Sequence, residues 1–394
     1  MAQFPRTTLI LILPILLITS ITLIPFTASA ADSEQAPSLY SETAVLMDAE
    51  TGQILYGKDA SRQMSPASIT KIASGILALE QGKLEDSVKI SEEAANVEGS
   101  TVYLLEEEEM QLEQLIQGML INSGNDAGTA IAEHIYGSEE EFSAEMTRYL
   151  EEETGIENTN FTNPHGLYGE DHYTTAEDMA RITRYAMENE AFREIVATKE
   201  LDWEGAGWET TLRNHHQLLW DYEGATGVKN GYVSQAGFTL VTTADRDGRE
   251  LIAVVMKAGS NAQAYEDTQD LLNFGFDEFE KQQTGEEQTI LSPDGTEFII
   301  PEDFTYLKKP GAETSFEIED DGNMAVVDVE SSEHIYELQL ELSEDVKPEE
   351  KQSAAPQQDS KEEKNDESFF VRNWSEFGYI MADIIRYQVY FWRN

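Results

Sequence analysis

Hydrophobic and polar residues follow two different periods along the first part of this chain. Residues 43–47 and 53–56 alternate between the two kinds on either side of a polar turn, which predicts a β-hairpin. Apolar residues three to four positions apart predict helices that begin near Ser68 and that cover 112–120 and 176–188. Strands and helices are therefore expected to interleave from the start of the fold.

A second strand region is expected around Lys229, which opens an apolar, strand-like run. Residues 238–243 and 251–257 predict two further strands joined by a tight turn, and residues 265–276 return to helical spacing. Helices interleaved with an antiparallel sheet describe an α/β (α+β) sandwich. We expect this sandwich to be a catalytic domain over residues 31–280.

The pattern changes after about residue 280. Residues 314–318, 324–329 and 336–342 alternate apolar with acidic residues between turns rich in Gly and Asp. This predicts a small all-β domain over residues 281–343, with one buried face. Residues 344–367 contain no aromatic residue and many Glu, Lys, Gln and Ser, which predicts a disordered acidic linker.

The first 30 residues have the composition of an export signal. Arg6 supplies a positive charge, residues 9–24 are apolar, and Ala28-Ser29-Ala30 is a small-residue cleavage site. The alternative is an uncleaved membrane anchor, because the apolar run is longer than a typical signal core. Pro14 and the cleavage site favour a signal peptide that is removed after Ala30.

The last segment, residues 368–394, has the spacing of an amphipathic helix. One face would carry Phe370, Trp374, Phe377, Met381, Ile384 and Phe391. The other would carry Arg372, Glu376, Asp383, Arg386 and Arg393. Five charges make a membrane span too costly, so we expect this helix to lie on the outer face of the cytoplasmic membrane and to tether the exported protein near the cell wall. The alternatives are a helix packed on the β domain and a homodimer contact.

Composition excludes several classes of function. The chain contains no Cys, so it has neither disulfide bonds nor a thiol nucleophile, and its 6 His show no paired spacing that favours zinc. We expect no metal and no cofactor. The net charge of −50 excludes nucleic acid as a partner, because the phosphate backbone would be repelled. Such a surface stays hydrated in high salt, and a salty or alkaline habitat is the simplest explanation.

Three short motifs carry the candidate chemistry: Ser68-Ile69-Thr70-Lys71, Ser123-Gly124-Asn125 and Lys229-Asn230-Gly231. At a helix start, the Ser68 hydroxyl lies near free backbone N–H groups, and Lys71 shares its face one turn later. Lys71 can act as a base only if its pKa is lowered, and burial beside the positive charge of Lys229 would lower it. An isolated Ser-x-x-Lys is more simply a helix cap followed by a surface lysine.

Together and in this order, the motifs resemble those of the penicillin-recognising serine transferases. The finer resemblance, over residues 38–345, is to the serine D-alanyl-D-alanine carboxypeptidases, the low-molecular-mass penicillin-binding proteins of the peptidase family S11 type. The additional matching stretches are Asn163-Pro164-His165-Gly166-Leu167, His172-Tyr173-Thr174-Thr175-Ala176 and Ala236-Gly237-Phe238. The resemblance implies the sandwich fold of that superfamily, the peptidoglycan stem peptide as substrate and β-lactams as inhibitors.

The resemblance also implies roles for individual residues. Ser68 would be the nucleophile, Lys71 its base and Ser123 the proton shuttle to the leaving amine. Asn125 would bind the substrate amide or Lys71, and the backbone N–H groups of Ser68 and Tyr232 would form the oxyanion hole. His165 and His172 are expected to brace loops.

The remaining binding residues lie near the third motif. Lys229 would bind the substrate carboxylate, and Gly231 would let the substrate lie along the strand edge. Asn230 departs from the family, which has Thr or Ser there, and its amide could replace that hydroxyl. Arg213 would help to bind the terminal carboxylate or would form a structural ion pair.

Two other functions remain open from sequence. A serine β-lactamase would need a Glu that speeds deacylation, and no such motif stands out between Asn125 and Lys229. A non-catalytic wall-binding scaffold is compatible with Asn230, but it would not need a nucleophile with its base. The preferred hypothesis is a D-Ala-D-Ala carboxypeptidase.

Overall fold

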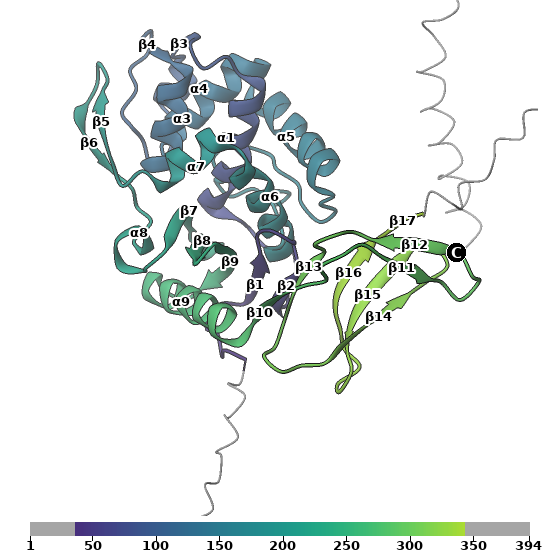
Figure 1. Ribbon diagram of the computed structural model, residues 1–394. Coiled ribbons are helices and arrows are strands. Elements are labelled where there is room, and N and C mark those ends of the chain that lie inside the picture. Colours follow the sequence, from purple (N-terminus) through teal and green to yellow (C-terminus); the bar gives the residue numbers. More distant parts are fainter. Residues whose placement is uncertain (1–35, 343–394) are drawn as a thin grey trace, which may run out of the picture. The chain divides into compact units, whose positions relative to one another are not determined.

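The structure, a computed structural model, describes residues 36–342 of the chain. Its largest sheet is antiparallel and has the strand order β2-β1-β9-β8-β7 (Figure 1). The strands are β1 (Thr43–Asp48), β2 (Ile54–Lys58), β7 (Ala225–Val233), β8 (Gly237–Arg246) and β9 (Arg249–Ala258). The predicted hairpin is β1–β2, and the predicted strands over 238–243 and 251–257 are β8 and β9. These predictions are confirmed.

Both faces of this sheet are buried, which the alternation of its side chains shows directly. In β1, Val45 and Met47 pack into one hydrophobic core, whereas Ala44 and Leu46 pack into the other. Successive side chains of a strand point to opposite faces, so a central strand covered on both sides must be apolar throughout. The sheet is therefore the middle layer of a sandwich.

Helices form the two outer layers. The helix α9 (Asn261–Glu278) packs on one face against β8 and β9, and α6 (Ala176–Glu188) packs on the other against β1 and β9. The remaining helices are η1 (Ala67–Ile69), α1 (Thr70–Gln81), α2 (Glu92–Ala95), α3 (Leu112–Ile121), α4 (Asn125–Tyr136), α5 (Glu139–Thr154), α7 (Glu190–Ala197) and α8 (Leu218–Asp221). Two small hairpins complete this part, β3 (Ser87–Lys89) with β4 (Glu109–Gln111) and β5 (Glu200–Glu204) with β6 (Glu209–Arg213).

Side-chain caps define several helix ends. The side chains of Ser138, Thr175, Asn189 and Ser260 accept hydrogen bonds from the N–H groups of the first turns of α5, α6, α7 and α9. The predicted helices over 112–120, 176–188 and 265–276 correspond to α3, α6 and α9, and they are confirmed.

The helix predicted near Ser68 is confirmed, because Ser68 lies in the turn η1, which leads directly into α1 at Thr70. One expectation about the motifs needs correction. Lys229 does not start a strand, because β7 begins four residues earlier at Ala225. The residues before Lys229 pair with β8, which extends the strand beyond the apolar run seen in the sequence.

The region after residue 280 contains only strands among its described residues, as predicted. They are β10 (Glu280–Gln283), β11 (Gln288–Leu291), β12 (Glu297–Ile300), β13 (Thr305–Lys308), β14 (Thr314–Ile318), β15 (Asn323–Asp328), β16 (His334–Gln339) and β17 (Glu341–Leu342). Their own small core contains Phe298, Ile300, Phe304, Tyr306, Met324, Val326 and Leu340. This core confirms an all-β region with one buried face.

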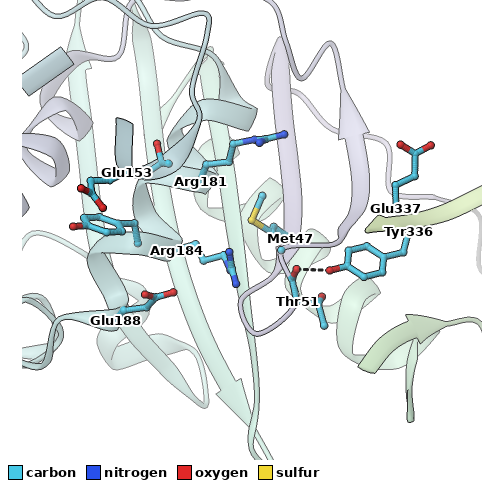
Figure 2. Close-up of a pocket in the computed structure, with 11 residues that line it drawn as sticks. Met47, Thr51, Glu153, Arg181, Arg184, Glu188, Tyr336 and Glu337 are labelled. Atoms are coloured by element: carbon cyan, nitrogen blue, oxygen red, sulfur yellow. Dashed lines mark hydrogen bonds between the residues drawn. The ribbon is translucent and has the colours of Figure 1, made fainter. Parts of the chain in front are cut away.

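The turn between β1 and β2 contacts this β region. The side-chain amide of Gln53 donates to the carbonyl oxygen of Leu307 over 2.8 Å and accepts from its N–H over 2.7 Å. Tyr336 Oη donates to the carbonyl oxygen of Thr51 over 2.9 Å, as Figure 2 shows. The first predicted hairpin therefore also holds the β region.

Within residues 36–342, no helix has the length and apolar character needed to cross a membrane. The expected signal peptide (1–30), the acidic linker (344–367) and the amphipathic tail (368–394) all lie outside the described residues.

Candidate active site

Ser68 lies in the turn η1, immediately before α1. The preceding Ala67 has a φ of 52°, a conformation that residues with a side chain adopt only when their surroundings enforce it. Thr239 Oγ1 on β8 donates to the carbonyl oxygen of Pro66 over 2.9 Å, and Thr70 Oγ1 donates to that of Ala67 over 2.8 Å. These contacts fix Ser68 at the N-terminal end of a buried helix, where backbone N–H groups favour developing negative charge.

Lys71 is completely buried one turn after Ser68. Its Nζ lies 3.3 Å from Ser68 Oγ, and it donates to Asn125 Oδ1 over 2.7 Å and to the carbonyl oxygen of His165 over 2.8 Å. The last two oxygens can only accept hydrogen bonds. A neutral amine has two N–H groups and one lone pair, so these two acceptors leave its lone pair for the proton of the Ser68 hydroxyl.

The electrostatics favour this neutral amine. Burial, together with the positive charge of Lys229, lowers the pKa of Lys71 well below its ordinary value, although Asp126 acts in the opposite direction. Lys229 is itself buried, and burial lowers its pKa to about 7. Burial and the charge of Lys229 are the two causes that the sequence analysis expected to lower the pKa of Lys71.

The second motif forms the turn between α3 and α4. Ser123 is buried and has a φ of 63°, and Asn125 is the first residue of α4. Asn125 Nδ2 donates to the carbonyl oxygen of Glu98 over 2.6 Å, which fixes the direction of the amide and turns Oδ1 toward Lys71. Of the two roles considered for Asn125, the structure shows the contact with Lys71.

Asp126 is a buried carboxylate that the sequence analysis did not single out. It accepts hydrogen bonds from the backbone N–H groups of Val102 and Leu104 over 3.0 and 3.1 Å. Burial raises the pKa of Asp126, and these hydrogen bonds oppose the shift. Asp126 therefore ties the segment around residue 103 to α4 and contributes negative charge near Lys71.

The third motif lies on β7, which is an edge strand of the sheet. A Cβ atom at Gly231 would lie 2.7 Å from the backbone nitrogen of Ser68, so only glycine lets the strand approach the nucleophile this closely. Tyr232 is 55% exposed, and its ring packs on that of Phe238 with the centroids 4.5 Å apart. Lys229 Nζ donates to the carbonyl oxygen of Asn230 over 3.0 Å. The free edge of β7 thus begins next to Ser68.

Comparison with known proteins identifies the family. A family model described as D-alanyl-D-alanine carboxypeptidase matches residues 30–260. The chain belongs to the D-alanyl-D-alanine carboxypeptidase family. This confirms the resemblance stated from the three motifs, and the family is one of serine peptidases.

Individual members agree in sequence and in fold. The D-alanyl-D-alanine carboxypeptidase DacF of Bacillus subtilis is 37% identical over 276 residues, which cover 67% of this chain and 70% of that protein. DacD of Escherichia coli is 33% identical over 260 residues, which cover 63% of this chain and 66% of that protein. Penicillin binding protein 5 from Haemophilus influenzae has a TM-score of 0.66 at 28% identity and covers 78% of this chain and 98% of its own. The DD-transpeptidase of Streptomyces K15 has a TM-score of 0.58 at 28% identity, and the match covers 61% of this chain and 99% of that protein. These neighbours confirm the penicillin-recognising sandwich fold.

Arg213 is the last residue of β6, and its role in binding the terminal carboxylate stays a prediction. Its guanidinium carbon lies 4.8 Å above the Trp220 ring, and within residues 36–342 it forms no ion pair. It lines a cavity of about 370 Å³ together with His215 and Trp220. Burial, followed by the positive charge of Lys229, lowers the pKa of His215 to about 4.

A larger cavity, of about 490 Å³, is separate from the motifs of the carboxypeptidase family (Figure 2). It is lined by α6, the β1–β2 turn and Tyr336, and Arg184 on its wall donates to the carbonyl oxygens of Ala49 and Glu50 over 2.8 and 3.0 Å. Arg184 thus holds the β1–β2 turn against α6. No group of three potential metal ligands occurs in the part of the chain that the structure describes.

Proposed function

We propose that this protein is a serine-type D-Ala-D-Ala carboxypeptidase that removes the terminal D-alanine from peptidoglycan stem pentapeptides through an acyl-enzyme on Ser68. The observation that carries the proposal is the set of contacts around Lys71. Its two N–H groups face obligate acceptors, and its lone pair is left for the hydroxyl of Ser68. A buried amine with a lowered pKa is the general base that such a hydroxyl requires.

The reaction would proceed in two stages. Ser68 Oγ attacks the carbonyl carbon of the penultimate D-Ala and gives its proton to Lys71, while the backbone N–H groups of Ser68 and Tyr232 stabilise the oxyanion. Ser123 passes the proton from Lys71 to the amide nitrogen, the C–N bond breaks and D-alanine leaves, so that Lys71 is neutral again. Water then attacks the ester, one of its protons returns to Ser68 Oγ, and the stem peptide is released with a new carboxylate.

The third motif would bind the substrate. The peptide would lie along the free edge of β7, with its terminal carboxylate near Lys229 and the amide of Asn230. Burial lowers the pKa of Lys229 to about 7, and a bound carboxylate favours its charged form again. A β-lactam carries a carboxylate beside a reactive carbonyl, so it would enter the same site as an inhibitor.

The first test is covalent labelling. We expect a fluorescent penicillin to label the protein at Ser68 and the label to persist for minutes or longer, because no dedicated deacylating Glu stands out. In parallel, a pentapeptide that ends in D-Ala-D-Ala should release D-alanine. Peptide mapping would locate the label, and Ser68→Ala should neither label nor release D-alanine. A label on another residue would overturn the proposal, and rapid turnover to penicilloate would point to a β-lactamase instead.

We also propose that the protein is exported after cleavage at Ala30 and tethered to the outer face of the membrane by residues 368–394. The support is the sequence pattern of aromatic residues on one helical face and the net positive charge of this segment in an acidic chain. The full-length mature protein should float with anionic liposomes, and a version that ends at Asn365 should not. A Phe377→Glu variant, which keeps the length and disrupts the apolar face, should also fail to float. Equal flotation of all three would rule out the tether.

A further inference from the structure

The carbonyl group of His165 belongs to a loop that is held on several sides. Within residues 163–167, Asn163 Oδ1 accepts from the N–H of Gly166 over 2.7 Å, and Asn163 Nδ2 donates to the carbonyl oxygen of Leu167 over 2.9 Å. Ser74 Oγ on α1 donates to the carbonyl oxygen of Pro164 over 2.5 Å. The loop therefore presents one backbone oxygen, that of His165, to Lys71.

The imidazole of His165 is almost fully buried and points to a carboxylate. Its Nδ1 accepts from the N–H of Leu167 over 3.3 Å, which places the proton on Nε2. Nε2 lies 3.3 Å from Oε1 of Glu139, and the same oxygen accepts from Thr129 Oγ1 over 2.5 Å. Thr129 is on α4, one turn after Asn125. Glu139 thus connects the loop that carries one acceptor of Lys71 to the helix that carries the other.

The protonation states of His165 and Glu139 favour the contact between the two side chains. Burial lowers the pKa of His165, and Lys71 in its protonated form lowers it further, although Glu139 acts in the opposite direction. Burial would raise the pKa of Glu139, but its contacts with His165 and Thr129 hold that pKa below its ordinary value. At neutral pH a neutral imidazole therefore faces an ionised carboxylate. Glu139 is also the first residue of α5, where the helix dipole favours negative charge.

We propose that Glu139 is a positioning residue for the acylation of Ser68, because it holds His165 in the place where its carbonyl oxygen directs the lone pair of Lys71. The inference rests on the proposed role of Lys71 as the base. Without Glu139, the imidazole loses its partner, the loop relaxes and Lys71 keeps only one fixed acceptor. The amine can then rotate away from Ser68. A misplaced catalytic group of this kind slows the reaction by about 10- to 100-fold.

The test compares Glu139→Ala, Glu139→Gln and Glu140→Ala by the second-order rate of acylation with a fluorescent penicillin. Glu140 is the exposed neighbour in the same first turn of α5, so its variant controls for the loss of a charge at the helix start. We expect Glu139→Ala to be slower by about 10- to 100-fold. Glu140→Ala should match the wild type. Glu139→Gln should recover most of the rate, since an amide oxygen can still accept from His165 and Thr129.

A purely structural role would give a different result. With the pentapeptide, Glu139→Ala should lower kcat with little change in KM, and it should shift the pH profile of acylation, because Lys71 loses one of its two fixed acceptors while Lys229 stays in place. If Glu139→Ala does not fold, Thr129→Val removes the second contact of Glu139 and should slow acylation by a smaller factor. Glu139→Ala and Glu140→Ala with equal rates would overturn the inference. A wild-type protein that is not labelled at Ser68 would instead contradict the proposed function.

Discussion

Replacement of Lys71 by methionine should slow the acylation of Ser68 by about 10³-fold or more, the scale seen when one member of a nucleophile–base pair is removed. Methionine has nearly the shape of lysine, so Ser68 should remain in η1 with its free backbone N–H groups. What is lost is the lone pair that accepts the proton of the hydroxyl. The residual rate would come from the oxyanion hole and from substrate binding alone.

The same variant should be as stable as the wild type, or more stable. The pKa of Lys71 lies below its unfolded value of 10.5, so at a pH between the two values the unfolded chain binds a proton that the folded protein does not. The stability of the wild type therefore rises with pH through this window, and it is lower when the buried amine must carry a charge. Methionine removes that cost, which offsets the two lost hydrogen bonds.

Both effects can be measured on one preparation. Stopped-flow labelling with a fluorescent penicillin gives the acylation rate, and thermal unfolding at pH 6 and pH 9 gives the stability. Lys83→Met, which changes an exposed lysine just beyond α1, is the matched control and should leave both quantities unchanged. If Lys71→Met acylates within tenfold of the wild type, Lys71 is not the base.

The sequence predicted the reacting groups much better than the atoms that position them. Ser68, Lys71 and Asn125 come together as their motifs imply, because each motif lies at the start of a helix or in the turn before one. Asn125 was expected to bind either the substrate amide or Lys71, but the second acceptor of Lys71 gave no signal, since it is a backbone oxygen whose position depends on a loop 94 residues away. Glu139 gave no signal either. It is one acidic residue among three at the start of α5.

The fold was predictable where the hydrophobic pattern is regular. Alternation found the β1–β2 hairpin, whose strand β1 is fully buried, and helical spacing found α6 with its bounds, because α6 buries a complete face. The hairpin β5–β6 was missed, since each of its strands buries only one residue, Trp203 and Leu212. Arg213, at the end of this hairpin, was placed by resemblance alone, and the structure puts its side chain over the Trp220 ring.

The largest backbone constraint near Ser68 lies at Gly166, and Gly166→Ala should slow acylation by about 100-fold. Gly166 has a φ of 88°, and an added Cβ would lie 1.9 Å from the carbonyl oxygen of Ala67. Both atoms belong to fixed parts of the backbone, so no rotation of a side chain can relieve the overlap. The loop must move away from η1, and the carbonyl oxygen of His165 moves away from Lys71 with it.

The control must share the strain of a positive φ without the overlap. Gly155 ends α5 with a φ of 66°, and nothing lies within 4 Å of an added Cβ. Gly155→Ala should therefore cost only about 1 kcal/mol of stability, a shift of a few degrees in Tm, and should acylate at the wild-type rate. Gly166→Ala should lose both stability and rate, as measured by thermal unfolding and by the second-order rate of labelling at Ser68. If it unfolds at a lower temperature but acylates as fast as Gly155→Ala, the loop stabilises the fold without positioning Lys71.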